Sequence, residues 1–475
     1  MTSLEGVATH ATGLPVRNRD RVDHHTQAEE CWMVFPQSLK GIAALFLIAK
    51  CGVALTPKMQ TIKDISVGVG EQLPSGWVGL GARSQAMGGT LAASTIDGTA
   101  LFVNPAQLTS VRRTEILGSL AMSRIRGTAD TGNPVTTSEL SATGTALNSL
   151  VVSAPYPVYR GGFTFALGYA RPSDYGQRMN RTGIVTLQGQ VFRQSDILRQ
   201  EGGLSHYAMG FGVEVAPTTS MGLSLRWQHG SVDVRRDITL VAQGLALPDS
   251  LVGRYRQHNS IDGLGVVLGT HTVLPAGFQM GLSVSTPTRY TLDGTWGDEY
   301  HEAIGANVYH YDYLENKLKY KIRSPWEFGA GLTWTTYALT LAADVWYADW
   351  QQARFDGSPY GASSGIDPDT FFETRYRGSL RWHIGGEFLV PVVNTYVRAG
   401  YWTGTEPFRG PLLDSGEALT VAGPSKAYSF GAGWLIDRVF ALDAAVVFRT
   451  GRMGTAQSVE KTGDRRFSVS AAFRM

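Results

Sequence analysis

The sequence predicts an all-β protein, a fourteen-stranded antiparallel transmembrane β-barrel with an N-terminal luminal hatch, or plug. Apolar and small or polar side chains alternate in segments of roughly ten residues from about residue 114 onward, the length that a tilted strand needs to cross a bilayer. Short and long connections between these segments alternate strictly. One earlier segment, 61–113, fits no strand of that wall.

Composition excludes several other classes of protein. The chain has 475 residues, a formal net charge of +2 and 17% charged residues, which gives no reason to expect nucleic acid as a partner. A polytopic helical membrane protein would need several uninterrupted apolar runs, and the sequence lacks them. Length alone would suggest two or three soluble domains, but the unbroken strand pattern favours one large closed sheet.

The N-terminal part reads as a leader. Residues 1–32 are polar and form a doubtful N-terminal extension, and we expect translation to start at Met33. Residues 33–54 are predicted to be a signal peptide, with the apolar run Gly41–Ala49 and cleavage after Ala54. The alternative is a genuine extension with a membrane anchor, for which this run is short.

Both cysteines of the chain, Cys31 and Cys51, precede the strand region. We therefore expect the mature protein to contain no disulfide. The alternative is a cytosolic protein with two buried thiols.

Fourteen strand candidates follow the leader, at 114–126, 147–157, 162–171, 204–217, 219–233, 260–274, 277–289, 325–336, 338–354, 374–390, 394–405, 425–436, 438–451 and 463–475. Six links are short, and the intervening links are long, at 127–146, 172–203, 234–259, 290–324, 355–373, 406–424 and 452–462. Short turns on one rim and long loops on the other are typical of an outer-membrane barrel, and an even strand count brings the C-terminus to the short-turn, periplasmic rim. A soluble β-sandwich would not require this alternation.

The two faces of the strands differ in polarity. In segment 219–233, Leu223, Leu225 and Trp227 lie on one face, and Arg226 and Gln228 lie on the other. A charge at mid-bilayer on the lipid face costs roughly 2–4 kcal/mol, so the apolar faces must point to lipid and the charged faces must line a lumen. A lumen of this width is not filled by its own side chains. We therefore predict that residues 55–113, rich in glycine and alanine, form a hatch inside a barrel of residues 114–475.

Several motifs resemble a known family. Gly81–Gly89 (GARSQAMGG), Asp97 and Phe102–Ala106 (FVNPA) resemble the N-terminal hatch of the FadL/TodX outer-membrane transporters, and later stretches near Ser324–Gly331 and Ala343–Trp350 resemble its barrel. The resemblance implies passive uptake of long-chain fatty acids or aromatic hydrocarbons across the bacterial outer membrane. It also implies that ligand binds outer loops, enters an internal pocket, and leaves through a gap in the wall after the hatch rearranges.

The predicted hatch motif is Asn104, Pro105 and Ala106. Pro105 fixes φ and lacks a donor, so the motif could hold the hatch against the wall, and the alternative is a simple turn. The family's usual glycine after this tripeptide is Gln107 here.

The predicted ligand-binding residues fall in two groups. Tyr309, Tyr311 and Tyr313 occupy the long link 290–324, where aromatic rings with polar tips suit capture of an amphipathic ligand; the alternative is packing between loops. The luminal arginines could pair with a carboxylate, and the alternative for each is a structural ion pair; they are Arg226, Arg381 and Arg398.

No catalytic motif is present, so we predict a protein that is not an enzyme, with no cofactor and no metal site. His301 and His310, near Asp298 and Glu299, are the only dense candidates for a hydrolase, and we interpret them as solvated loop residues.

The expected partners are a hydrophobic small-molecule ligand and outer-membrane lipid, and we expect a monomer in the outer membrane of a Gram-negative bacterium. Three alternatives stay open. They are a general porin, a barrel resembling the secretion-associated PorV group, which shares the Met-Gly-Gly and Asn-Pro-Ala opening, and an outer-membrane enzyme.

Overall fold

The computed structural model describes residues 79–131, 136–187, 190–244, 249–304, 306–357, 369–408, 424–455 and 458–475. The predicted leader, residues 1–54, and the first part of the predicted hatch, residues 55–78, lie outside the described residues. None of the helices in the described ranges is long and apolar enough to cross a membrane.

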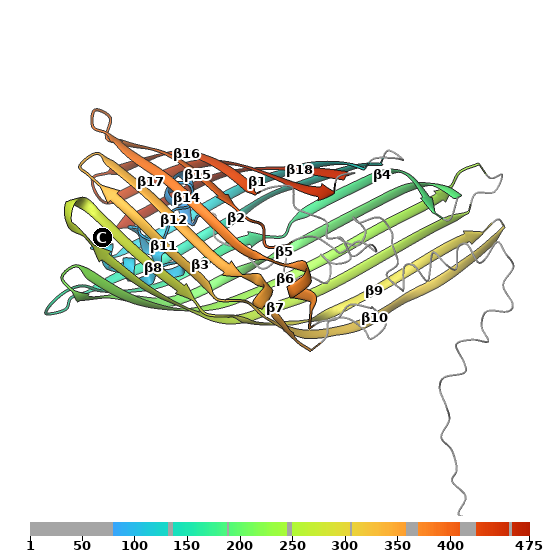
Figure 1. The fold of residues 1–475 in the computed structure, drawn as a ribbon, viewed down its shortest axis with the longest axis horizontal. Helices are drawn as coiled ribbons and strands as arrows, with labels where there is room; N and C mark the ends of the chain where they lie inside the picture. The colour runs from blue at the N-terminus through green and yellow to red at the C-terminus, as the bar shows by residue number, and fades with distance from the viewer. Residues whose placement is uncertain are drawn as a thin grey trace, which may run out of the picture. The chain divides into compact units, whose positions relative to one another are not determined.

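The wall is one antiparallel sheet that closes where β1 pairs with β18 (Figure 1). Its 18 strands are β1 (Glu115–Thr131), β2 (Thr136–Tyr156), β3 (Phe163–Asp174), β4 (Gln177–Leu187), β5 (Gln190–Ala216), β6 (Thr219–Ala242), β7 (Ser250–Val273), β8 (Phe278–Ser285), β9 (Arg289–Ile304), β10 (Asn307–Arg323), β11 (Glu327–Thr335), β12 (Leu339–Asp349), β13 (Arg354–Asp356), β14 (Gly378–Val390), β15 (Thr395–Gly404), β16 (Ser425–Ile436), β17 (Phe440–Thr455) and β18 (Ser458–Arg474). Strands β4, β9, β11 and β13 continue β3, β8, β10 and β12 along the same neighbours. The closed barrel therefore has fourteen wall strands, as predicted.

The short links also lie where they were predicted, between β2 and β3, β5 and β6, β7 and β8, β11 and β12, β14 and β15, and β16 and β17. Asp437 and Arg438 join β16 to β17 with positive φ at both residues, 51° and 57°. Two consecutive left-handed residues match the twist of a tight hairpin, which explains how this turn can be so short.

The long links differ from the prediction. Most of 127–146, 172–203, 234–259 and 290–324 is strand, because the wall strands extend into these links. The extensions belong to β1, β2, β4, β5, β6, β7, β9 and β10. The reason is a reversal of pattern along each strand. In β6 the buried positions change from polar, at Ser224, Arg226 and Gln228, to apolar, at Val232 and Val234. Beyond the membrane the outer face meets water, so the polar side chains turn outward and the segment resembles a solvated loop when read alone.

The described end of the predicted hatch, residues 79–113, is named here the luminal segment. It contains α4 (Gly81–Ala86), η2 (Gly98–Phe102) and η3 (Pro105–Ser110). Wall glycines face it: a Cβ at Gly400 would collide with the backbone of Gly88, and a Cβ at Gly281 would collide with the carbonyl of Ala92. Glycine at these wall positions allows backbone to pack on backbone.

Hydrogen bonds tie the luminal segment to strands around the barrel. The Asp344 carboxylate of β12 accepts from the amides of Leu91 and Ala92 at 2.5 and 2.8 Å. The Arg83 guanidinium pairs with Glu387 of β14 at 3.0 Å. Ser429 of β16 and Ser470 of β18 also bond to it, so the described segment contacts strands on several sides of the barrel.

Asn104 and Pro105 begin η3. The Asn104 side chain accepts from the Ala106 amide at 3.3 Å, and proline occupies the first helical turn, the usual arrangement at a helix N-terminus. The Asn104 amide also donates to the carbonyls of Ala92, at 2.7 Å, and of Thr270 in β7, at 3.1 Å. The motif is thus a capped helical turn bonded to the wall.

Gln107, which replaces the glycine typical of the resembled family, is fully buried. Its side-chain amide donates to the carbonyls of Leu91 and Ala92 at 2.7 and 3.0 Å, and its oxygen accepts from the Thr95 amide at 2.9 Å. The departure therefore serves to cross-link the luminal segment internally.

Candidate functional site

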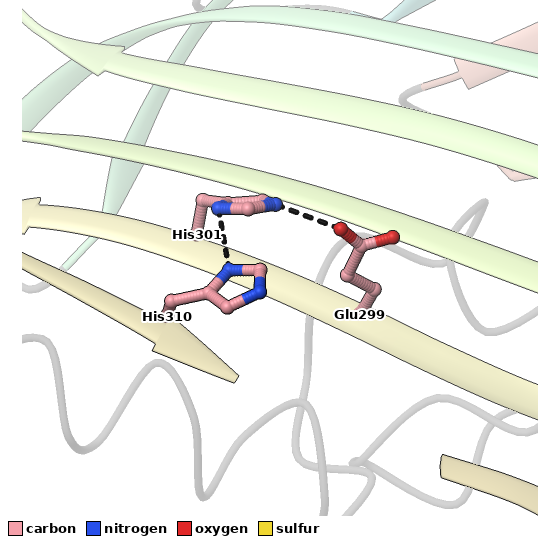
Figure 2. Close-up of side chains that lie close together, drawn as sticks. All are labelled: Glu299, His301 and His310. Atoms are coloured by element: carbon pink, nitrogen blue, oxygen red, sulfur yellow. Dashed lines mark hydrogen bonds and ion pairs between the residues drawn. The ribbon is translucent and has the colours of Figure 1, made fainter. Parts of the chain in front are cut away.

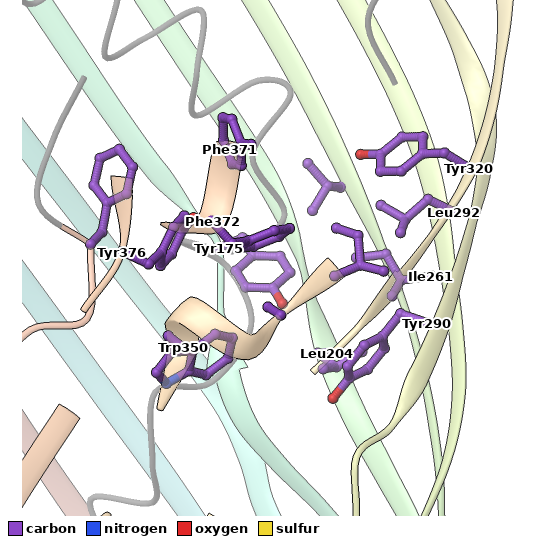
Figure 3. Close-up of a cluster of buried hydrophobic side chains, with 14 of the residues drawn as sticks. Tyr175, Leu204, Ile261, Tyr290, Leu292, Tyr320, Trp350, Phe371, Phe372 and Tyr376 are labelled. Atoms are coloured by element: carbon purple, nitrogen blue, oxygen red, sulfur yellow. The ribbon is translucent and has the colours of Figure 1, made fainter. Parts of the chain in front are cut away.

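Buried apolar side chains gather inside the part of the barrel that the long strand extensions form. We name this group the aromatic cluster (Figure 3); it comprises Tyr175, Leu198, Leu204, Val232, Val234, Ile261, Tyr290, Leu292, Tyr320, Ile322, Ala348, Trp350, Ala353, Phe371, Phe372, Tyr376 and Phe408. Most of its members occupy the inward positions of the strand extensions described above. The pattern reversal along those strands thus creates an apolar lining in the outer half of the lumen.

Two short helices complete the aromatic cluster from inside. Helix η5 (Trp350–Gln352) supplies Trp350, and α5 (Phe371–Arg375) supplies Phe371 and Phe372. The rings of Phe371 and Phe372 lie 5.2 Å apart edge to face, and Tyr376 lies 5.0 Å from Phe372. These separations are typical of favourable aromatic pairs, so the three rings form one aromatic group within the cluster.

A pocket lies next to the aromatic cluster and shares Tyr290, Ala348 and Trp350 with it. We name it the polar pocket; it is lined by His206, Arg226, Gln228, Ser285, Thr286, Thr288, Tyr290, Ser324, Pro325, Glu327, Ala348 and Trp350. The Tyr290 hydroxyl donates to Gln228 at 2.7 Å, and Gln228 donates to Thr288 at 3.0 Å. The lumen therefore changes from an apolar surface to a polar one over a single side chain, Tyr290.

The three predicted arginines have different surroundings. Arg226 lines the polar pocket, is 5% exposed, and donates to the Phe102 carbonyl of the luminal segment at 3.2 Å. It makes no ion pair with any carboxylate of the described ranges. Arg381 pairs with Glu327 at 2.5 Å, and Arg398 pairs with Glu387 and Asp443.

Arg226 is thus the one of these three arginines without a carboxylate at ion-pair distance in the described ranges; Glu327, which lines the same pocket, pairs with Arg381. Arg398 belongs to a structural network that also includes Arg83 of the luminal segment, because both arginines share the Glu387 carboxylate. A buried cation that lacks a carboxylate partner is the kind of group that recognises an acidic ligand.

The structure describes the side chain of one of the three predicted tyrosines, Tyr309, and it is not part of the aromatic cluster. Tyr309 is exposed near the end of the β9–β10 hairpin, and the side chains of Tyr311 and Tyr313 lie outside the described residues. His301 and His310 also lie in that hairpin, away from the polar pocket. Tyr320, which the sequence places in the same aromatic-rich link, does belong to the aromatic cluster. The sequence argument missed Tyr175, Tyr290 and Tyr376, which alternation could have revealed had the strands been extended past the membrane.

The wall is interrupted beside the aromatic cluster. The ladder of β2 pairs Ser149 with Ala170 of β3 and resumes only at Ser141 with Arg178 of β4, so no described register joins residues 142–148 to residues 171–177. Pro172 lies in this stretch and lacks the amide that a ladder needs.

Residues on both strands that border the interruption contact groups inside the barrel. Tyr175, which lies within it, belongs to the aromatic cluster. Asn148 of β2 accepts from the Gly81 amide at 3.2 Å and from Gln85 at 3.3 Å, both in the luminal segment. The aromatic cluster and the luminal segment therefore each border the wall interruption, through Tyr175 and Asn148 respectively.

Comparison with known proteins agrees with this architecture. A family model described as outer membrane protein transport protein (OMPP1/FadL/TodX) matches residues 75–473. The chain is similar to the P. putida toluene transporter TodX, with 15% identity and a TM-score of 0.56, covering 84% of this chain and 99% of that one. It is likewise similar to a Pseudomonas aeruginosa FadL homologue (16% identity, TM-score 0.56, 83% and 98% covered).

The Ralstonia pickettii toluene transporter TbuX gives a comparable likeness, with 15% identity, a TM-score of 0.52, and 83% and 99% of the two chains covered. A comparison with curated protein sequences gives no match. At these identities the solved structures support the fold of the barrel.

Proposed function

Because the chain belongs to the OMPP1/FadL/TodX family of outer-membrane transport proteins, which move hydrophobic compounds across the outer membrane, we propose that its ligands are amphipathic acids such as long-chain fatty acids, taken up passively. The observation that carries this proposal is the succession of an aromatic cluster and a polar pocket that contains Arg226. A ligand with an apolar chain and a carboxylate head matches both surfaces at once.

The energetics favour such a ligand. Each methylene that leaves water for the aromatic cluster contributes about 0.8 kcal/mol, so a long chain gains more than a short one. A carboxylate on Arg226 adds a charge-assisted hydrogen bond, worth about 1.5–3 kcal/mol.

In the proposed route, ligand enters the aromatic cluster from outside, binds with its head in the polar pocket, and leaves sideways between β2 and β3. Tyr175 supports this route because it belongs both to the cluster and to the wall interruption. The luminal segment must shift from Asn148 to open the exit, since its bonds to that residue border the interruption.

A neutral aromatic hydrocarbon is the second candidate. The many rings of the aromatic cluster favour it, and two of the similar structures are toluene transporters. Such a ligand would not need Arg226, which makes that residue the means of telling the two ligands apart.

Uptake by purified protein in lipid vesicles tests the proposal. We expect labelled oleate to enter vesicles that contain the barrel faster than vesicles without it, and single-channel conductance to stay far below that of an open porin. High conductance would favour the porin alternative, and a co-purifying protein partner without uptake would favour a secretion-associated barrel. Absence of both oleate binding and oleate uptake would refute the proposal.

A further inference from the structure

Two histidines and a glutamate meet on the outer face of the β9–β10 hairpin (Figure 2). Glu299 and His301 are two residues apart in β9, so their side chains lie on the same face. His310 of β10 is the direct cross-strand partner of His301. The three side chains come together because of the register between the strands, which no spacing in the sequence reveals.

Their contacts form a short chain of hydrogen bonds. The Nε2 atom of His301 lies 2.8 Å from Oε1 of Glu299, and its Nδ1 atom lies 2.7 Å from Nδ1 of His310. Since a carboxylate can only accept, His301 donates through Nε2, which leaves its Nδ1 lone pair to accept from His310. One donor atom from each of the three residues lies within 4.8 Å of the others.

We propose that Glu299, His301 and His310 bind a divalent transition-metal ion of the Zn²⁺ type. Two imidazoles and a carboxylate are a donor set that suits zinc, with water in the fourth position. Metal–ligand bonds of about 2.0–2.1 Å in a tetrahedron place the donor atoms about 3.3 Å apart. One ion binds only one nitrogen of His301, so the contact from Nε2 to Glu299 must open by about half an ångström, and His310, which bonds to the other ring nitrogen, must turn toward the ion. The cation takes the place of the proton on His301.

Arg254 is the nearest other charged residue to Glu299, and it contacts only one of the two carboxylate oxygens. Arg254 of β7 lies 3.7 Å from Oε2, whereas Oε1 faces His301. Bound metal would connect β9 to β10 near their common tip, three residues from the start of β10 at Asn307.

Two other outward-facing histidines provide matched controls. His258 lies 2.7 Å from Asp233, and His229 lies 2.8 Å from Asp262, each a pair of two residues rather than three. All three sites place an exposed histidine beside a carboxylate on the outer face, but the three-residue group of metal-binding side chains in the described part of the chain is the one around His301.

The test is a Zn²⁺ titration of the purified full chain, carrying an affinity tag without histidine, against a competing fluorescent chelator. Because His24 and His25 are adjacent in the sequence, the same titration is run with both replaced by alanine. Loss of an outer partner alone weakens metal sites by about 10- to 100-fold, so we expect H301A and H310A each to lower affinity at least about tenfold, and H258A to leave it unchanged.

Co²⁺ substitution and hydrogen exchange give independent readouts. The Co²⁺ form should show the visible absorption of a four-coordinate site, which H301A removes, and Zn²⁺ should slow amide exchange at the end of the β9–β10 hairpin. Equal affinities of wild type, H301A and H310A would overturn the proposal, as would an equal loss in H258A. In that case His301 and His310 would be joined only by a hydrogen bond.

Discussion

Replacing Arg226 should separate the recognition of an acidic head from the recognition of an apolar chain. Arg226 lines the polar pocket and makes no ion pair within the described ranges, so a ligand carboxylate would be its anionic partner. In R226Q the charge is lost while an amide donor remains for the Phe102 carbonyl. The aromatic cluster, which holds the chain of the ligand, is untouched.

The magnitude follows from the interaction that disappears. A hydrogen bond to a charged group contributes about 1.5–3 kcal/mol in a buried site, and each 1.4 kcal/mol corresponds to a factor of ten. We therefore expect R226Q to weaken binding of oleate by about 10- to 150-fold. Methyl oleate has the same chain without the charge, so its affinity should change by less than about threefold.

The assay is equilibrium binding of labelled oleate and of labelled methyl oleate to purified protein in detergent. Folding of the variant is checked by the shift in electrophoretic mobility that barrels show on heating. An equal loss for acid and ester would refute the reasoning, because the defect would then lie in the pocket as a whole. Unchanged oleate affinity in a folded R226Q barrel would refute it as well, and would favour a neutral aromatic ligand.

Two further predictions concern the luminal segment and the wall interruption. G400V should sharply reduce the yield of heat-modifiable barrel, because its side chain collides with the Gly88 backbone. G386A should fold normally, since its Cβ meets the tip of Leu341 at 3.3 Å and the Thr340 carbonyl at 3.8 Å; equal yields of the two variants would contradict the packing described here. Oxidation of the double variant G144C/D174C should join β2 to β3 across the interruption and stop oleate uptake, with recovery on reduction, since a Cβ at Gly144 lies 3.2 Å from the Asp174 carboxylate. Uptake that continues in the fully cross-linked protein, with each single cysteine variant as control, would rule out this exit.

The number of wall strands and the position of the short turns could be predicted from the sequence. Each membrane-crossing segment must present an apolar side chain to lipid at every second position, and this requirement acts on each strand independently of its neighbours. The pattern in segment 219–233 is therefore legible without knowing what it pairs with, and the structure has β6 beginning at Thr219.

The extent of the strands could not be predicted in this way. Outside the membrane the outer face of β6 becomes polar, with Asp233, Arg235 and Asp237 at alternate positions, and nothing local separates such a segment from a solvated loop. Pairing with β5 and β7 keeps β6 a strand. That pairing depends on three segments at once, so the sequence of one segment does not reveal it. The aromatic cluster was missed for this reason.

The sequence by itself determined a barrel of fourteen wall strands and the position of its short turns, because alternation, turn length and lipid exposure are local constraints. Only the tertiary structure decided which charges are already paired. Arg226 and Arg398 look alike as inward positions, yet Arg398 meets two carboxylates and Arg226 meets the Phe102 carbonyl. Register across the wall decided the rest, since it alone sets which side chain of a neighbouring strand lies within reach.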